Sequence, residues 1–250
     1  MFEFANGLEI LLMTIFLSHR GESDDEPENT MAAFELATKR DSDGIELDIR
    51  LTADGELVCV HDKTLKRVSG TDLAVASSTL SELRRYHPVP LLSEALDCLT
   101  VGMHMQIELK GTPILIQPLK KVLDNWTGDC SCLSISSFEQ ETIRLAADIF
   151  PDQRRIILID LNKYFSCFPE AEQVIKLLYS LRCTGISFLA TKEACSLFVD
   201  ELKQAGFRVV CWGISSDELG LAMANIGVDA MTCNHAVALR EKWLAASGSS

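Results

Sequence analysis

Strand-like and helix-like segments alternate eight times along this chain of 250 residues, and that alternation limits the folds open to it. Each short, mostly apolar run is followed by a stretch in which apolar residues recur at helical spacing. The expected strands are 13–18, 44–51, 104–110, 131–136, 155–160, 185–189, 208–212 and 228–232. Strands that alternate with helices form parallel sheets. Eight units in a chain of this length predict an α/β fold, a single (β/α)8 TIM barrel, over a doubly wound sheet, which no glycine-rich dinucleotide motif supports.

The expected barrel occupies residues 13–245 as one domain. Residues 1–12 are a leader to which the sequence assigns no role, and residues 246–250 are expected to form a disordered tail. Residues 63–90 are irregular and rich in serine and threonine, so a short capping insertion is expected after the second strand.

The second strand differs from most others because charged residues alternate with apolar ones along it. Glu46 and Asp48 therefore share one face. An Asp-Gly turn at 54–55 predicts a β-hairpin, with residues 56–60 as the returning strand. If those two residues alone form the loop, His61 lies opposite Asp48, whereas a longer loop shifts the pairing by about one residue.

Charged positions also alternate in the third strand, and they indicate a site. Strands of a closed barrel are buried on both faces and are usually continuous apolar runs. Active sites of this fold lie at the carboxyl ends of the strands, where the sequence has His19, Glu46, Asp48, Glu108, Lys110 and Trp212. The alternatives are a solvent-facing polar strand for Glu46 and Asp48, and a structural ion pair for Glu108 with Lys110.

Five short motifs, in this order and spacing, resemble the glycerophosphodiester phosphodiesterase family. They are His19-Arg20-Gly21, Pro27-Glu28-Asn29-Thr30, Glu46-Leu47-Asp48, Leu51-Thr52-Ala53-Asp54-Gly55 and His61-Asp62. The resemblance covers residues 15–239, is strongest before Lys110 and is thin after Phe138. Residues 213–215 and 232–234 depart from the family's usual sequences, which leaves substrate preference in doubt more than catalysis.

The resemblance implies a metal-dependent enzyme that hydrolyses glycerophosphodiesters to sn-glycerol 3-phosphate and an alcohol. His19 and His61 match the family's two catalytic histidines, one a general acid and the other a general base, in an order that stays open. Glu46, Asp48 and Glu108 match its metal ligands. Carboxylates select hard cations, so we expect Mg²⁺ or Ca²⁺, with Mn²⁺ as a third candidate.

Four further residues are expected at the pocket. Arg20 and Lys110 are candidates to hold phosphate oxygens, although Arg20 could instead pair with the carboxylates. Trp212 is expected to wall the pocket against the substrate's carbon chain, unless it is a plain core aromatic. Phe138 is a weaker pocket candidate, from a step that resembles the family's Ser-Phe. Asn29 is expected to cap the first helix.

Charge and cysteine content bear on partners and compartment. The net charge of −13 argues against a nucleic-acid partner, so a small-molecule glycerophosphodiester is the expected ligand. The apolar run at residues 8–17 is too short to span a membrane, and no stable membrane anchor is expected. Nine cysteines without a disulfide or metal-ligand framework favour a reducing compartment, and hence the cytoplasm.

Two other functions stay open. One is a lysophospholipase D-type lipid phosphodiesterase, which the lack of a basic amphipathic helix makes less favoured. The other is a non-catalytic barrel that binds a phosphorylated ligand, which the intact histidines and carboxylates argue against. The preferred alcohol, the native metal and the oligomeric state do not follow from the sequence.

Overall fold

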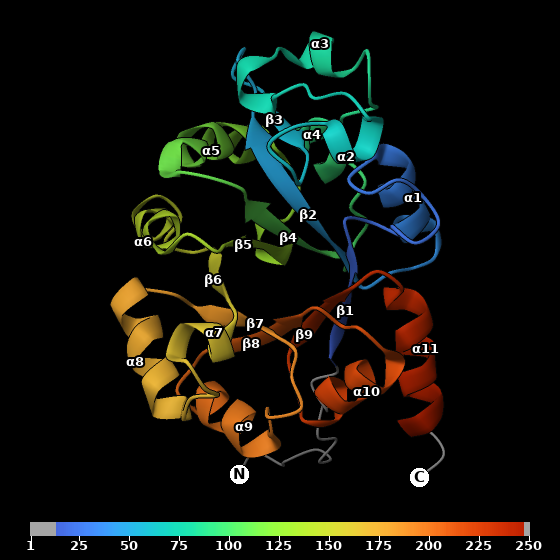
Figure 1. Ribbon diagram of the computed structural model, residues 1–250. Helices are drawn as coiled ribbons and strands as arrows, with labels where there is room; N and C mark the ends of the chain where they lie inside the picture. The colour runs from blue at the N-terminus through green and yellow to red at the C-terminus, as the bar shows by residue number, and fades with distance from the viewer. Residues whose placement is uncertain (1–13, 248–250) are drawn as a thin grey trace, which may run out of the picture.

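In the part of the chain that the structure describes, nine strands form one sheet, and eight of them close into a parallel barrel (Figure 1). The computed structural model describes residues 14–247. The barrel strands are β1 (Ile15–His19), β2 (Gly44–Leu51), β4 (His104–Leu109), β5 (Leu133–Ser137), β6 (Arg154–Ile159), β7 (Gly185–Leu189), β8 (Arg208–Trp212) and β9 (Ala230–Cys233). Their order is β1-β9-β8-β7-β6-β5-β4-β2, and β1 pairs with β2 to close the ring. The predicted (β/α)8 barrel is confirmed, with each predicted strand within two residues of an observed one.

Helices surround the barrel on its outside (Figure 1). The longer ones are α1 (Met31–Lys39), α5 (Ile116–Asn125), α6 (Gln140–Ile149), α8 (Ala171–Leu181), α9 (Ser196–Gln204), α10 (Asp217–Asn225) and α11 (Ala236–Ser247). The short ones are α2 (Lys66–Ser69), α3 (Leu80–Leu83), α4 (Leu92–Leu96) and α7 (Leu161–Phe165), with 3₁₀ turns η1 (Val75–Ser77), η2 (Pro113–Leu115) and η3 (Cys130–Cys132). Within residues 14–247, no helix combines the length and apolar character needed to cross a membrane.

Two details of the helices differ from expectation. The short helix α7 was not predicted. Its N-cap residue is Asp160, whose side chain accepts a hydrogen bond from the Lys163 backbone N–H at 3.0 Å. Helix α11 extends to Ser247 and so includes the first two residues of the predicted tail. The leader 1–12 and residues 248–250 lie outside the described residues.

The main core lies between the strands and the helices. On β2, Ile45, Leu47 and Ile49 point outward and pack with residues of α1, α4 and α5. The intervening Glu46 and Asp48 therefore face the barrel interior. A small apolar cluster fills part of that interior and consists of Leu17, Ile156, Val210 and Ala230.

The strand register brings polar positions of neighbouring strands together. His19 lies beside Glu46, and Asp48 lies beside Glu108. Gln106 lies on the other side of Glu46. Neighbouring strands are about 5 Å apart, so these inward-facing side chains converge at the carboxyl ends of β1, β2 and β4.

The hairpin loop is one residue longer than the shortest expected form. β3 (Leu57–Cys59) runs antiparallel to β2, in a register that puts Val60 opposite Asp48, and the Val60 N–H donates to the Asp48 carbonyl at 3.0 Å. The longer-loop alternative is therefore confirmed, and the pairing is shifted by one position from that of Asp48 with His61. Gly55 takes a φ of +83° in the loop, which is typical of a three-residue hairpin loop.

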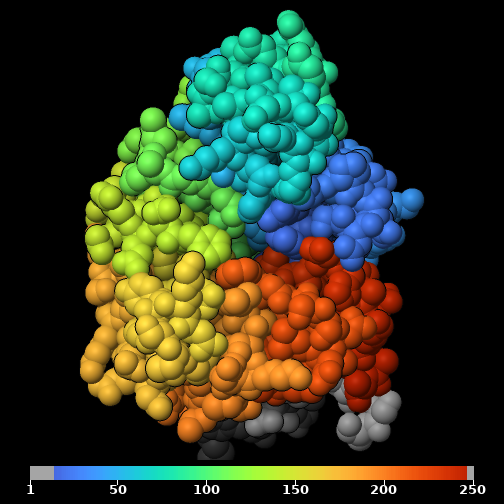
Figure 2. All heavy atoms as spheres, viewed as in Figure 1, coloured from blue at the N-terminus to red at the C-terminus, as the bar shows by residue number. Residues whose placement is uncertain are grey.

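The insertion, residues 63–90, follows β3 and protrudes from the molecule at the top of the view (cyan in Figures 1 and 2). It contributes α2, η1 and α3. Its own small core, shared with β3 and the residue after it, consists of Val58, Val60, Leu65, Val75, Leu83 and Val89. Because this core is separate from the barrel core, the insertion packs as a distinct unit on the rim.

Candidate active site

A cavity of about 450 Å³ opens among the carboxyl ends of the strands. All but one of the predicted site residues line it: His19, Arg20, Glu46, His61, Glu108, Lys110, Phe138 and Trp212. The exception, Asp48, is fully buried beside the cavity. A second hollow, of about 720 Å³, lies between the hairpin loop and α5, and its lining includes none of these residues.

Three buried carboxylates meet at the wall of the cavity. One oxygen from each of Glu46, Asp48 and Glu108 lies within 4.8 Å of the other two. Burial, followed by the charge of Asp48, raises the pKa of Glu46 well above its ordinary value and that of Glu108 to about 7. The raised pKa values mean that the cluster resists carrying three negative charges at once, and that it favours the uptake of protons or of another positive charge.

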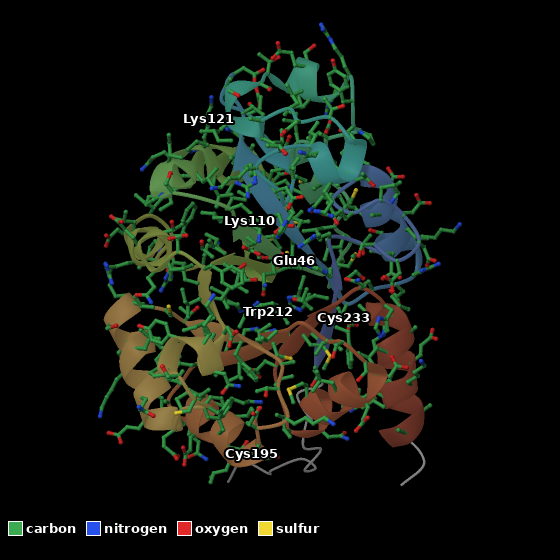
Figure 3. All side chains as sticks on the ribbon, viewed as in Figure 1. Glu46, Lys110, Lys121, Cys195, Trp212 and Cys233 are labelled. Carbon is green, nitrogen blue, oxygen red and sulfur yellow. The ribbon has the colours of Figure 1, made fainter. Side chains whose placement is uncertain are left out.

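Two cationic side chains already contact the cluster. Lys110 Nζ lies 2.6 Å from Glu108 Oε1 and 3.2 Å from Asp48 Oδ1. Arg20 Nε lies 3.0 Å from Asp48 Oδ2. Burial alone would raise the pKa of Asp48, but Lys110 and Arg20 outweigh that effect and lower it. Figure 3 shows Lys110 and Glu46 near the middle of the barrel, with Trp212 on the opposite side of the same region. Both ion pairs proposed as alternatives for these cations are thus present.

In both cavity histidines, the ring nitrogen Nδ1 is hydrogen-bonded to a side-chain oxygen. His19 Nδ1 lies 2.7 Å from Asn234 Oδ1, and His61 Nδ1 lies 2.6 Å from Asp62 Oδ1. An amide or carboxylate oxygen only accepts hydrogen bonds, so each Nδ1 is protonated and is the hydrogen-bond donor. Nε2 is left as the ring atom able to exchange a proton with a ligand. Burial lowers the pKa of both rings and so favours the neutral form.

Asn29 supports the carboxylate cluster instead of capping α1. Its Nδ2 donates to Asp48 Oδ2 at 2.9 Å, and its Oδ1 accepts from the Asp48 N–H at 3.3 Å. The expected cap is wrong, because the N-cap residue is Thr30, whose side chain accepts from the Ala33 N–H. Asn29 adopts a φ of +53°, which turns the chain toward β2 just before the helix begins.

Charged side chains just outside the cavity form hydrogen bonds with Arg20 and His61, which line it. The guanidinium of Arg67, on α2, donates to both oxygens of Glu28 at 2.6 and 2.7 Å, and to Asp62 at 2.7 Å. Glu28 in turn accepts from Arg20 at 2.9 Å. Arg67 therefore links the insertion to one cation and one histidine pair of the site. Nothing in the irregular sequence of the insertion singles out this arginine, although the motif around Glu28 does point to its partner.

Arg50 fixes the backbone at His61. Its Nε and Nη2 donate to the His61 carbonyl at 2.9 and 2.6 Å. This contact explains why His61 reaches the cavity although the hairpin register places it one position beyond Asp48. Arg50 is two residues after Asp48 on β2, and its contact with His61 depends on the length of the hairpin loop.

The opposite side of the cavity is apolar. The rings of Phe138 and Trp212 meet edge to face, with centroids 5.5 Å apart. Leu158 and Ile214 complete this side. Phe138 is 44% exposed and so lies at the rim. Within the described chain, no residue of the insertion lines the cavity. The cavity therefore has one charged wall and one apolar wall, as a ligand with a phosphate and a carbon chain requires.

Comparisons with known proteins agree with this arrangement. The sequence profile of the Glycerophosphoryl diester phosphodiesterase family matches residues 19–238. A glycerophosphodiester phosphodiesterase of Bacillus altitudinis is 34% identical over 157 residues, 56% of this chain and 64% of that protein. One of Caldanaerobacter subterraneus is 45% identical over 74 residues, 30% of each chain. The alignments thus span less than two thirds of the length of these curated relatives.

A solved structure covers more of the chain. The structure of an Oleispira antarctica phosphodiesterase, in complex with the product sn-glycerol-3-phosphate, superposes with a TM-score of 0.78. It is 26% identical and covers 92% of this chain and 96% of that one. The structural similarity therefore extends over nearly the whole chain.

Proposed function

The chain belongs to the glycerophosphoryl diester phosphodiesterase family, and on that premise we propose that it hydrolyses glycerophosphodiesters to sn-glycerol 3-phosphate and an alcohol. One observation carries the proposal: two histidines, each held at Nδ1, share a cavity with three buried carboxylates. The names of the relatives and the product bound to the Oleispira antarctica enzyme support the substrate class.

Glu46, Asp48 and Glu108 are proposed to hold a divalent metal ion, Mg²⁺ or Ca²⁺, with Mn²⁺ as a third candidate. The all-oxygen donor set fits a hard cation. The buried Glu46 Oε2 has no hydrogen-bond partner within the described residues, as expected of an atom reserved for a cation. When bound, the metal would offset the repulsion among the carboxylates and polarise a phosphate oxygen.

His19 and His61 are proposed as the acid–base pair. One Nε2 takes a proton from the attacking hydroxyl, and the other gives a proton to the departing alkoxide. Asn234 and Asp62 keep both Nε2 atoms directed away from the backbone. The attacking hydroxyl belongs either to water or to the neighbouring carbon of the substrate's glycerol, which would give a cyclic phosphate intermediate.

Arg20 and Lys110 are proposed to bind the non-bridging phosphate oxygens. Both line the cavity while contacting carboxylates. A guanidinium has five N–H donors and an ammonium three, so each can hold a carboxylate and a phosphate oxygen together. Trp212 and Phe138 are proposed to contact the carbon chain of the substrate. A small-molecule substrate and a cytoplasmic location complete the proposal, the latter supported by nine free cysteines.

The test uses purified protein with three phosphodiesters, with and without added Mg²⁺ or Ca²⁺. We expect release of sn-glycerol 3-phosphate from glycerophosphocholine and glycerophosphoethanolamine. Faster turnover of lysophosphatidylcholine would favour the lysophospholipase D alternative. Binding of glycerophosphocholine without turnover, under every metal condition, would favour the non-catalytic barrel. His104→Gln is a matched control for the histidine variants, since His104 lies at the opposite, amino-terminal end of a barrel strand.

A further inference from the structure

Three basic side chains lie in one layer of the barrel interior, at the end opposite the active site. Strands β4, β6 and β8 begin at His104, Arg154 and Arg208. Side chains four positions apart share one face of a strand, so these three face the same way as residues that line the active-site cavity. Those cavity residues are, in the same order, Glu108, Leu158 and Trp212. The basic layer therefore faces inward, about 13 Å along the strands from the active-site layer.

A second, small cavity lies within this basic layer. His104, Arg154 and Arg208 all line it, and its volume is about 10 Å³. A cavity of this volume has room for about one particle the size of a water molecule. Among the described residues, no carboxylate lines it. Bulky branched apolar residues usually fill such a layer of a barrel, so three basic residues in one layer require another explanation.

The two arginines of this layer lack a counter-charge of their own. Within residues 14–247, neither guanidinium forms a hydrogen bond or an ion pair, although both side chains are half-buried. Burial, followed by the charge of Arg154, lowers the pKa of Arg208. Burial, followed by the charges of both arginines, lowers the pKa of His104. The three groups are thus close enough for their positive charges to repel one another.

The carboxylates nearest to the basic layer already have other partners. Asp43 and Asp229 are the carboxylates whose charges reach it. Asp43 forms an ion pair with Arg240, and Asp229 forms one with Lys203 at 3.1 Å. Neither of them lines the cavity. In a chain with 36 acidic and 23 basic residues, these three basic side chains surround one cavity without a carboxylate in its wall.

We propose that this cavity binds one small inorganic anion, chloride, held by His104, Arg154 and Arg208. Guanidinium groups only donate hydrogen bonds, and chloride accepts several at once. A monatomic anion suits a space of this size, whereas a phosphate ester has too many heavy atoms. Water suits the size but brings no charge to offset the repulsion. The bound anion stabilises the fold at the amino end of the barrel, and its binding does not depend on the proposed catalytic activity.

Thermal unfolding tests the proposal when chloride replaces gluconate at constant ionic strength and constant Mg²⁺. The Tm of wild-type protein should rise along a saturating curve, because the anion binds the native state alone. Arg208→Met and Arg154→Met each remove one set of donors and keep the length of the side chain. Each should weaken chloride binding about tenfold, the effect of one hydrogen bond to a charged group. Two separate variants keep the test valid if one of them fails to fold.

Arg144→Met is the matched control, because Arg144 is exposed on α6 and does not line this cavity. It should respond to chloride as the wild type does, which separates the site from general salt effects. Bromide-soaked crystals should show an anomalous peak between the two guanidiniums in the wild type and none in Arg208→Met. The same chloride response in the wild type and both cavity variants would overturn the proposal. Bromide found at the protein surface and not in the cavity would also overturn it, as an adventitious ion only.

Discussion

At the scale of single residues, the two cavity histidines differ in their partners: His19 donates to a neutral amide, and His61 donates to a carboxylate. Replacing either by alanine should lower kcat by about 10²–10⁴-fold, the usual contribution of one acid–base group. The double variant should lose less than the product of the two, since residues that act as a unit are not additive. Steady-state kinetics with glycerophosphocholine measures both effects.

A nitrophenyl phosphodiester distinguishes the two roles. Its leaving group needs no general acid, so the variant that lacks the acid should regain activity on it and the variant that lacks the base should not. Either single variant retaining wild-type kcat on glycerophosphocholine would contradict the two-histidine mechanism. His104→Gln should behave as wild type throughout.

Glu108 should destabilise the metal-free protein at neutral pH. Its carboxyl has a pKa of about 7 in the fold, above its ordinary value of 4.5, because burial and Asp48 disfavour the charge. A raised carboxyl pKa means that the native state binds more protons, so this group's contribution to stability falls as pH rises from 4.5 to 7. Glu108→Gln should therefore raise the Tm of metal-free protein at pH 8 and have little effect at pH 4.5. Thermal unfolding at both pH values, in chelator, measures this, and a Tm loss at pH 8 would make Glu108 structural.

Site residues that belong to a sequence pattern could be predicted from the sequence. Site residues that depend on contacts between distant parts of the chain could not. The strand-end positions of Glu46, Asp48 and Glu108 followed from alternation. Asn29 was misassigned because asparagine is equally typical of a helix cap, and its contact with Asp48 appears only in three dimensions. The same holds for Gln106, whose place below the carboxylates depends on the register between strands.

At the scale of elements, the hairpin shows which structural features a local sequence pattern predicts and which it does not. The Asp-Gly signal predicted the turn and both strands correctly. It did not specify the loop length, because Thr52 also takes part: its Oγ1 accepts from the Glu56 N–H and donates to Asp54. A side chain that closes the loop from one residue earlier shifts the register of the returning strand by one position.

Among the described residues of the insertion, Arg67 makes the side-chain hydrogen bonds that reach the site. We therefore expect the insertion to influence catalysis through this residue. Arg67→Met frees Glu28 and Asp62, so Arg20 and His61 lose their outer support. We expect kcat/KM to fall about 10–100-fold, as for other outer partners of an active site. Lys66→Met is the matched control on the same helix, since Lys66 pairs with Asp72 at the surface. Equal kinetics for the two variants would show that the insertion does not position the site.

At the scale of the whole molecule, the fold was the most predictable property. Eight hydrophobic strand runs separated by helices leave few architectures for a chain of this length. The insertion and α7 were less predictable, because short helices have too few turns for a clear apolar period. The closure of the ring, with β1 beside β9, follows from the fold class and not from any local signal.

Metal removal should affect both activity and global stability. Chelation should abolish hydrolysis, and added Mg²⁺ or Ca²⁺ should restore it. A ligand that binds the native state alone stabilises it by about 2.7 kcal/mol at a hundredfold excess over Kd. The Tm should therefore rise with metal concentration in the wild type and much less in Glu108→Gln. Full activity in excess chelator, with no metal found by elemental analysis, would rule out the metal-dependent mechanism.

The seam between β1 and β9 has a consequence for biosynthesis. His19 and its hydrogen-bond partner Asn234 are 215 positions apart in the sequence, although both line the same cavity. A nascent chain emerging from the ribosome can pair β1 with β2 early, but it cannot bring Asn234 to His19 until β9 has been translated. Contacts of such long sequence separation form late. The site can therefore be completed only after nearly all of the chain has been synthesised, and shorter nascent chains would carry the five motifs without the complete site.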